Sequence, residues 1–202
     1  MNYKRYLLNI LYIFLIEIVF NIALFNKITY YFFYILLFSI LPGTIISLIT
    51  GFLNESVNKI SNIVINSVIT LIFIAQLIHY RFYQSIFSIY SLINGAQVFG
   101  FMSAIGKIML HNTEYIIFLL FPLFFFIVLG LNISFKKYTK KELLILIGII
   151  PISILLSILV LNTDKDKNYN AKDLYYNTHA PTISTQKLRL LTTMRLDWKR
   201  AI

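Results

Sequence analysis

YIIFLLFPLFFFIVLGLNISF, residues 115–135, is a run of 21 residues without a single charged side chain. At 1.5 Å per helical residue, about 20 residues cross a hydrocarbon core about 30 Å thick. A membrane-spanning β-strand would alternate apolar and polar residues over about ten positions, whereas this run is continuously apolar. The stretch therefore predicts a transmembrane α-helix.

Apolar runs of similar length occur on both sides of this stretch. Hydrophobic residues make up 58% of the chain and charged residues only 13%, which is more apolar surface than one soluble core of this size can hide. We therefore predict an all-α, polytopic membrane protein with a five-helix transmembrane domain over residues 1–162. The expected spans are residues 6–25, 29–52, 60–80, 115–135 and 143–162.

Residues 83–106 also lack charge, but the basic residues argue against a sixth span. Lys4 and Arg5 form one basic patch and residues 136–141 form another, and the positive-inside rule places both in the cytoplasm. Four crossings between the patches keep them on one side, whereas five would separate them. We therefore expect residues 83–106 to form an external interfacial helix, amphipathic or broken.

This count gives a multi-pass protein of the cell membrane with a cytoplasmic N-terminus and an extracellular C-terminus. The short external loops then carry Lys27, Arg81 and Lys107. The formal charge of +10 is explained by Lys and Arg beside the spans, where they meet anionic lipid head groups. The expected partner is therefore the lipid bilayer and not nucleic acid.

Residues 163–202, here called the tail, are polar and basic. Residues 163–173 are expected to be an extracellular linker, and Pro181 to end one local structure. Ser184 would then cap a C-terminal linker helix that starts near Thr185. On this helix Leu188, Leu191 and Met194 recur at helical spacing and form an apolar stripe. The stripe needs a cover: the membrane surface, residues 83–106, or a domain that follows.

Catalytic chemistry has no complete set of residues in this sequence. The absence of cysteine excludes disulfides, thiolate catalysis and Cys-based metal sites. The tail threonines have no partner base at a recognisable spacing, and a nucleophile needs such a base or a metal beside it. We assign no catalytic, cofactor-binding or metal-binding residue, so the chain by itself does not predict an enzyme.

Glu17 is the one acidic residue deep inside an expected span, and Asn21 follows one turn later. Intramembrane carboxylates are costly and usually face a bundle interior or a polar path. Glu17 is therefore either functional or a hydrogen-bonded structural residue. A small transporter, with a break at Pro42 and Gly43, would require Glu17, whereas an anchor or scaffold should tolerate its replacement by Gln.

A second group of candidates lies around the third and fourth spans, at the face predicted to be external. His79, Arg81, Tyr83 and His111 could together contact a lipid head group, because Arg forms paired bonds with phosphate oxygens. The alternative is an interfacial belt, in which aromatic side chains anchor the helices at head-group depth.

Three segments carry a family resemblance: HYRFYQSIFS (79–88), NGAQVFG (94–100) and LYYNTHAPTISTQKLRLLTTMRLDWKR (174–200). Together with the five spans, they resemble the N-terminal membrane half of the lipoteichoic acid synthase family. These are phosphoglycerol transferases of the alkaline phosphatase/sulfatase superfamily in the bacterial cell envelope. One departure is Arg189, which stands where the resemblance leads us to expect a small residue such as glycine.

The resemblance implies a linker helix that seats an extracellular catalytic domain on the membrane. That domain would hold manganese or magnesium and a metal-bound threonine, which takes glycerol phosphate from phosphatidylglycerol for a polymer on a glycolipid acceptor. The chain ends where that domain would begin, so no catalytic residue is carried over. A stand-alone scaffold that binds anionic lipid or a partner enzyme remains the alternative, and a small transporter a third. The Ile-, Asn-, Lys-, Tyr- and Phe-rich composition suits a low-GC, Gram-positive bacterium.

Overall fold

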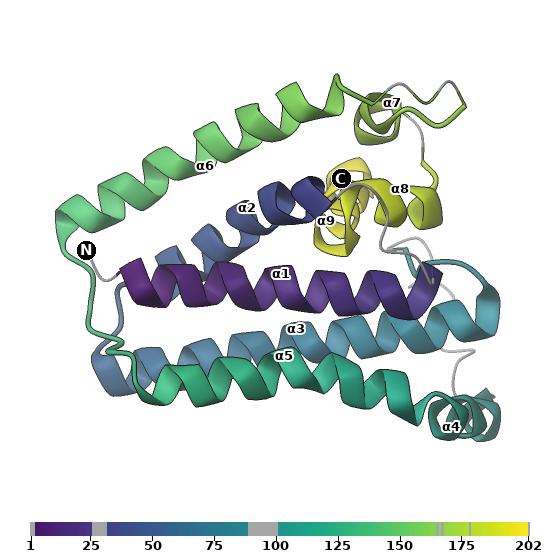
Figure 1. Cartoon of the computed structure of the whole chain (residues 1–202), viewed down its shortest axis with the longest axis horizontal. Coiled ribbons are helices and arrows are strands. Elements are labelled where there is room, and N and C mark those ends of the chain that lie inside the picture. The colour runs from purple at the N-terminus through teal and green to yellow at the C-terminus, as the bar shows by residue number, and fades with distance from the viewer. Residues whose placement is uncertain are drawn as a thin grey trace.

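Five long apolar helices form most of the computed structural model, which describes residues 3–25, 32–88, 101–164, 166, 168–177 and 179–201 (Figure 1). Each is long and apolar enough to cross a membrane. The predicted all-α class and the five spans are therefore confirmed. The five helices are α1 (Tyr3–Phe25), α2 (Phe32–Thr50), α3 (Glu55–Tyr83), α5 (Thr113–Leu131) and α6 (Lys140–Leu161).

The observed helices differ from the expected spans by a few residues at their ends. α3 begins at Glu55, five residues before the expected start at 60, and an acidic side chain in the first turn suits a helix N-terminus. α5 ends at Leu131, short of the expected 135, and Phe135 turns back into the core instead. Hydropathy located the spans, but these end residues are set by local contacts.

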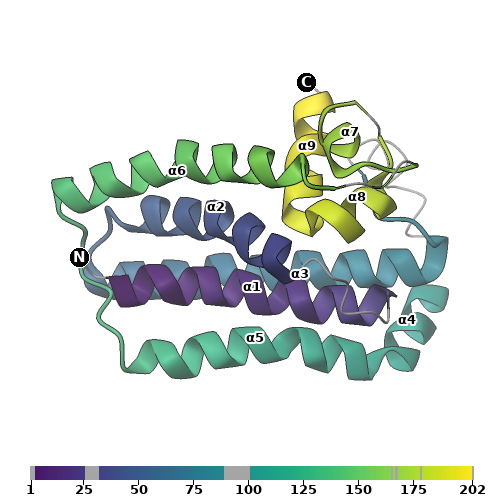
Figure 2. The same ribbon diagram turned by 45° about the horizontal axis from the view of Figure 1, so that its top comes forward.

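α1 is the central helix, with α2, α3 and α5 packed against it, whereas α6 packs mainly on α2 (Figures 1 and 2). The chain begins at one end of the bundle, here called the N-terminal end. α4 (Met102–His111) and the tail lie at the opposite end, here called the tail end. The main core joins α1, α3 and α5 through buried side chains that include Tyr12, Phe20, Phe73 and Phe126.

Arg5 closes the N-terminal end of the bundle, whereas the sequence analysis counted it with Lys4 in a basic patch. Its side chain is fully buried, and the guanidinium lies 3.7 Å above the ring of Tyr138. It also donates to the backbone carbonyls of Phe135 and Lys136 at 3.3 and 3.1 Å. Arg5 thus ties α1 to the loop between α5 and α6, while Lys4 stays exposed.

α4 overlaps the predicted external interfacial segment, residues 83–106, only over residues 102–106. It lies across the tail end of the bundle and buries none of its side chains fully (Figure 1). The rest of the predicted external segment lies largely outside the described residues, including NGAQVFG at 94–100, and so does Lys27.

The tail forms α7 (Ala171–Tyr176), α8 (Pro181–Leu188) and α9 (Leu190–Ala201). The expected start of the linker helix near Thr185 was wrong: Pro181, which was expected to end a local structure, begins a helix. Proline suits the first helical position, because its missing N–H is one of the groups that a helix start leaves unpaired. Ser184 therefore lies inside α8, and the predicted single helix is broken at Arg189.

The apolar stripe of the tail is covered by the bundle itself, a partner that the sequence did not suggest. Leu190, Leu191 and Met194 pack against the main core. Leu188 and Leu196 enter a second cluster, here called the tail core, which joins α2 and α6 to the tail. Its other buried members are Tyr34, Phe38, Leu161, Ala171 and Leu174.

Gly43 of α2 lies against α1 and explains the Pro42–Gly43 pair as a site of close helix approach. A Cβ at this position would lie 2.8 Å from Cγ1 of Ile10 and 3.0 Å from its backbone Cα and N. We expect Gly43→Ala to push α1 and α2 apart and to destabilise the protein by about 1–3 kcal/mol, as overpacking does. Thermal unfolding in lipid nanodiscs measures the effect.

The matched control is Gly148→Ala in α6, where a Cβ would meet nothing within 4 Å. Because alanine favours a helix, this change should leave the melting temperature unchanged or slightly higher. Equal melting temperatures for both variants would contradict the close approach at Gly43.

Candidate functional site

α8 and α9 meet at Arg189, whose backbone has φ 75° and ψ 160°. This region is populated almost only by glycine, and a residue with a Cβ pays about 1–3 kcal/mol to occupy it. The expectation of a small residue at this position thus coincides with a backbone conformation that favours glycine. The sharp turn at Arg189 separates α8 from α9 and directs the N-terminus of α9 at α1.

Glu17 of α1 caps that N-terminus. Its two carboxylate oxygens accept hydrogen bonds from the backbone N–H groups of Leu190, at 3.2 Å, and Leu191, at 3.1 Å. The first N–H groups of a helix have no partner within the helix and carry partial positive charge, so an anion is favourable there. The carboxylate is 2% exposed, so these bonds form where water does not compete.

Arg189 and Asn21 complete the contact between α1 and the tail. Nη1 of Arg189 donates to Oδ1 of Asn21 at 2.7 Å, and Nδ2 of Asn21 donates to the backbone carbonyl of Glu17 at 2.9 Å. The Arg189 guanidinium also interacts favourably with the Glu17 carboxylate. A buried carboxylate and a buried guanidinium are tolerable together, whereas either charge alone would be costly.

In this arrangement Glu17 is hydrogen-bonded inside the bundle, as the structural alternative for this residue expects. Glu17 lies eight residues before the end of α1, about 12 Å along the helix axis. Its hydrogen-bonding capacity is used to hold α9, and the amide of Asn21 is used to hold Arg189. The site is therefore a docking site for the tail inside the bundle, here called the Glu17 site.

Within the tail, Lys187 of α8 is tethered to the loop that follows α6. Its ammonium donates to Asp164 Oδ2 at 2.8 Å, to Asp166 Oδ2 at 2.9 Å and to the backbone carbonyl of Tyr169. Burial by itself would raise the pKa of Asp164, but the bonds from Lys187 and two backbone N–H groups outweigh it and lower that pKa. The carboxylates therefore stay charged at neutral pH and hold α8 in place.

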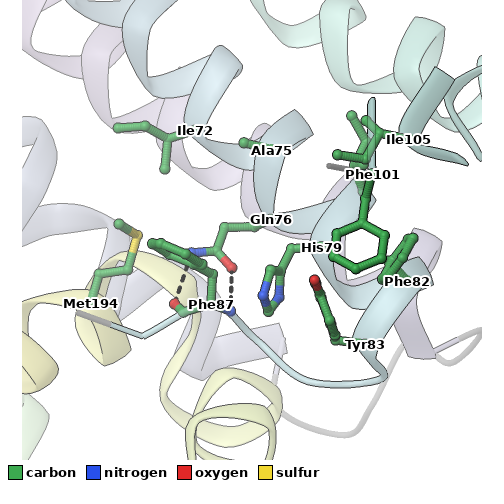
Figure 3. A pocket seen from close by; sticks show the side chains of 11 residues that line it. Ile72, Ala75, Gln76, His79, Phe82, Tyr83, Phe87, Phe101, Ile105 and Met194 are labelled. Atoms are coloured by element: carbon green, nitrogen blue, oxygen red, sulfur yellow. Dashed lines mark hydrogen bonds between the residues drawn. The ribbon is translucent and has the colours of Figure 1, made fainter. Parts of the chain in front are cut away.

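The predicted head-group residues divide between two hollows at the tail end. His79 and Tyr83 line an apolar cavity of about 420 Å³ between α3, α4 and α9, with their rings 4.8 Å apart (Figure 3). Gln76 closes one side by bonding both backbone groups of Phe87, at 2.9 and 3.1 Å. Met194 of the tail also lines this cavity, so the tail shapes one wall.

Arg81 and His111 line the other hollow, which is polar and lies between α3, α4 and α5 together with Lys107. Arg81 donates to the backbone carbonyl of Ala23 at 2.8 Å, and its guanidinium lies 4.9 Å from the centre of the Tyr115 ring. Arg81 thus holds three helix ends together. The structure therefore places the four predicted residues at one end of the bundle but not in one site.

Several residues of these sites were missed in the sequence. The two ion pairs of Lys187 join residues more than 20 positions apart, and no local pattern indicates such pairs. The role of Arg189 is signalled only by its departure from the expected small residue. A usable signal did exist in Asn58, Asn62 and Asn66, which recur at the four-residue spacing of one helix face.

No family model matched the chain, and searches of curated proteins and of solved structures found no match.

We expect Glu17→Gln to loosen α9. A neutral amide offers one acceptor oxygen for two N–H groups and leaves the buried Arg189 guanidinium without its counter-charge, so about 1.5–3 kcal/mol of docking should be lost. Limited trypsin digestion at Arg195, Lys199 and Arg200, followed by mass spectrometry, measures this as faster cleavage within the tail.

Glu114→Gln is the matched control, since Glu114 is an exposed carboxylate in the first turn of α5. It should leave tail cleavage at the wild-type rate. If Glu17→Gln were cleaved no faster than this control, the carboxylate would not hold the tail.

Proposed function

We propose that this chain is a membrane anchor that holds its own C-terminal tail in a fixed position against the bundle. The observation that carries the proposal is the pair of hydrogen bonds from the N-terminus of α9 to Glu17. It favours an anchor over a transporter, because the polar groups on which transport would depend, Glu17 and Asn21, are engaged in docking the tail. Close packing at Gly43 likewise explains the Pro42–Gly43 pair without a transport role.

We further propose that the anchor belongs to an envelope phosphoglycerol transferase similar to the lipoteichoic acid synthase family. In this proposal the N-terminus is cytoplasmic, the tail is extracellular, and α9 seats a catalytic domain on the outer face of the cell membrane. That domain would supply the manganese or magnesium and the threonine nucleophile. The support is the resemblance over residues 79–100 and 174–200, together with a tail that docks on the bundle at Glu17 and is held to itself by Lys187.

The experiment that tests the transferase proposal reads the native gene beyond codon 202 and measures the mass of its product in membranes. We expect an open frame that encodes a hydrolase-type domain with a metal-bound threonine. A stop codon after Ile202, with accumulation of a 23.6 kDa product, would exclude the transferase and leave a scaffold that docks its own tail.

The partners in this proposal are the lipid bilayer, phosphatidylglycerol as donor and a glycolipid as acceptor. We place an anionic head group in the polar hollow with Arg81, Lys107 and His111, because two basic side chains line it against the single carboxylate of Glu114. We expect native mass spectrometry to retain more phosphatidylglycerol than phosphatidylcholine on the wild type, and less phosphatidylglycerol after Lys107→Gln. Lys141→Gln, at the other end of the bundle, should change nothing. Equal retention of both lipids by the wild type would contradict the head-group site.

A further inference from the structure

A line of polar side chains runs through the half of the bundle nearest the N-terminal end. Asn58, Asn62 and Asn66 lie one turn apart on α3, all fully buried, and Thr70 continues the line. Buried amides in a transmembrane helix are costly unless every donor and acceptor finds a partner. The amide groups of this line therefore need hydrogen-bond partners inside the bundle.

α1 presents a matching line at the same levels. Arg5 and Asn58 both donate to the backbone carbonyl of Phe135, at 3.3 and 2.9 Å. Nearer the tail end, the hydroxyl of Tyr12 donates to the backbone carbonyl of Asn66 at 2.6 Å. Since α1 and α3 run in the same direction, these two contacts fix their register (Figure 1).

Asn9 and Asn62 occupy the level between those two contacts. Asn9 donates to Oγ of Ser47 on α2 at 2.8 Å, and Asn62 donates to the side-chain and backbone oxygens of Asn58. The polar side chains of α1 and α3 thus form one continuous seam, here called the asparagine seam. It extends from Arg5 to Thr70.

Five buried polar atoms in the seam have no hydrogen-bond partner among the described residues. Both Oδ1 and Nδ2 of Asn66 are unpaired, so the side chain has an unpaired donor and an unpaired acceptor whichever way its amide is oriented. The other three are Oδ1 of Asn9, Oδ1 of Asn62 and Nη2 of Arg5. Buried groups of this kind in a native protein are usually satisfied by ordered water.

The unpaired atoms also indicate what kind of molecule could bind beside them. They include donors, from Arg5 and Asn66, and acceptors, from Asn9, Asn62 and Asn66. A metal cation is disfavoured by the guanidinium of Arg5, and an anion by the amide oxygens. A small neutral molecule that both donates and accepts satisfies all five atoms.

We propose that the asparagine seam binds a short chain of ordered water molecules inside the membrane-embedded bundle. Arg5 and Tyr12 are seven positions apart, about 10 Å along the helix, and one buried water makes about three hydrogen bonds, so about two or three waters suffice for the five atoms. This site lies apart from the Glu17 site, and the proposal is independent of the function proposed above.

Both ends of the seam are closed. Arg5 and Tyr138 cover the N-terminal end. Towards the tail end, the buried rings of Phe20 and Phe73 pack edge to face at 5.0 Å and separate the seam from the tail. The water is therefore held between α1, α2 and α3, where it bridges helices instead of forming a path across the membrane.

X-ray hydroxyl-radical footprinting tests the proposal, because radicals generated from a bound water oxidise the side chain beside it even when bulk solvent has no access. Tyr12 is 1% exposed and borders the seam, whereas Phe73 is 0% exposed and lies in the dry aromatic pair. We expect Tyr12 to be oxidised several-fold faster than Phe73 in nanodiscs. Equal protection of Tyr12 and Phe73 in the wild type would overturn the proposal.

A variant pair makes the test specific to the seam. Asn66→Leu removes the amide with two unpaired ends and should reduce oxidation of Tyr12 to the level of Phe73. Asn112→Leu replaces a buried amide outside the seam and should leave Tyr12 oxidation unchanged. Undiminished oxidation of Tyr12 in Asn66→Leu would also overturn the proposal. If Asn66→Leu does not fold, the wild-type comparison with Phe73 decides alone.

Discussion

One carboxylate inside the bundle determines where the tail of this chain lies. The N-terminus of α9 brings two unpaired N–H groups and a partial positive charge into a region without water, and Glu17 supplies the acceptor that both require. The dependence is mutual, since Glu17 inside a transmembrane helix is itself costly without these donors and the guanidinium of Arg189. Neither the carboxylate nor the start of α9 is stable there without the other.

Other contacts reinforce this one without replacing it. The tail core packs α7, α8 and α9 against α2 and α6, and Lys187 fastens α8 to the loop after α6. Hydrophobic packing holds a helix against a surface but tolerates sliding, whereas a carboxylate bonded to two particular N–H groups fixes rotation and height. A tail held in this way suits an anchor that must present a segment at a set distance from the membrane.

The class and the five spans could be predicted from the sequence because hydropathy and length are local properties of each segment. Glu17 and Asn21 could be singled out for the same reason, as polar residues in an apolar run. Their partner could not be predicted, because Leu190 and Leu191 contribute backbone N–H groups that no side-chain pattern reveals. The break at Arg189 was missed because a positive φ at a residue with a side chain depends on tertiary contacts. The asparagine seam, by contrast, has a four-residue period that a closer inspection of residues 55–83 could have found.

Amide hydrogen exchange at Leu190 and Leu191, measured residue by residue in nanodiscs, tests the central claim most directly. First-turn amides normally exchange quickly, because no carbonyl within the helix accepts from them. Lys140 and Lys141 occupy the same two positions in α6, on exposed residues, and serve as the internal reference. Docking on Glu17 predicts that Leu190 and Leu191 exchange far more slowly than this pair. Exchange of all four amides at similar rates would show that the N-terminus of α9 is not bonded to Glu17, and the account of the tail would be wrong.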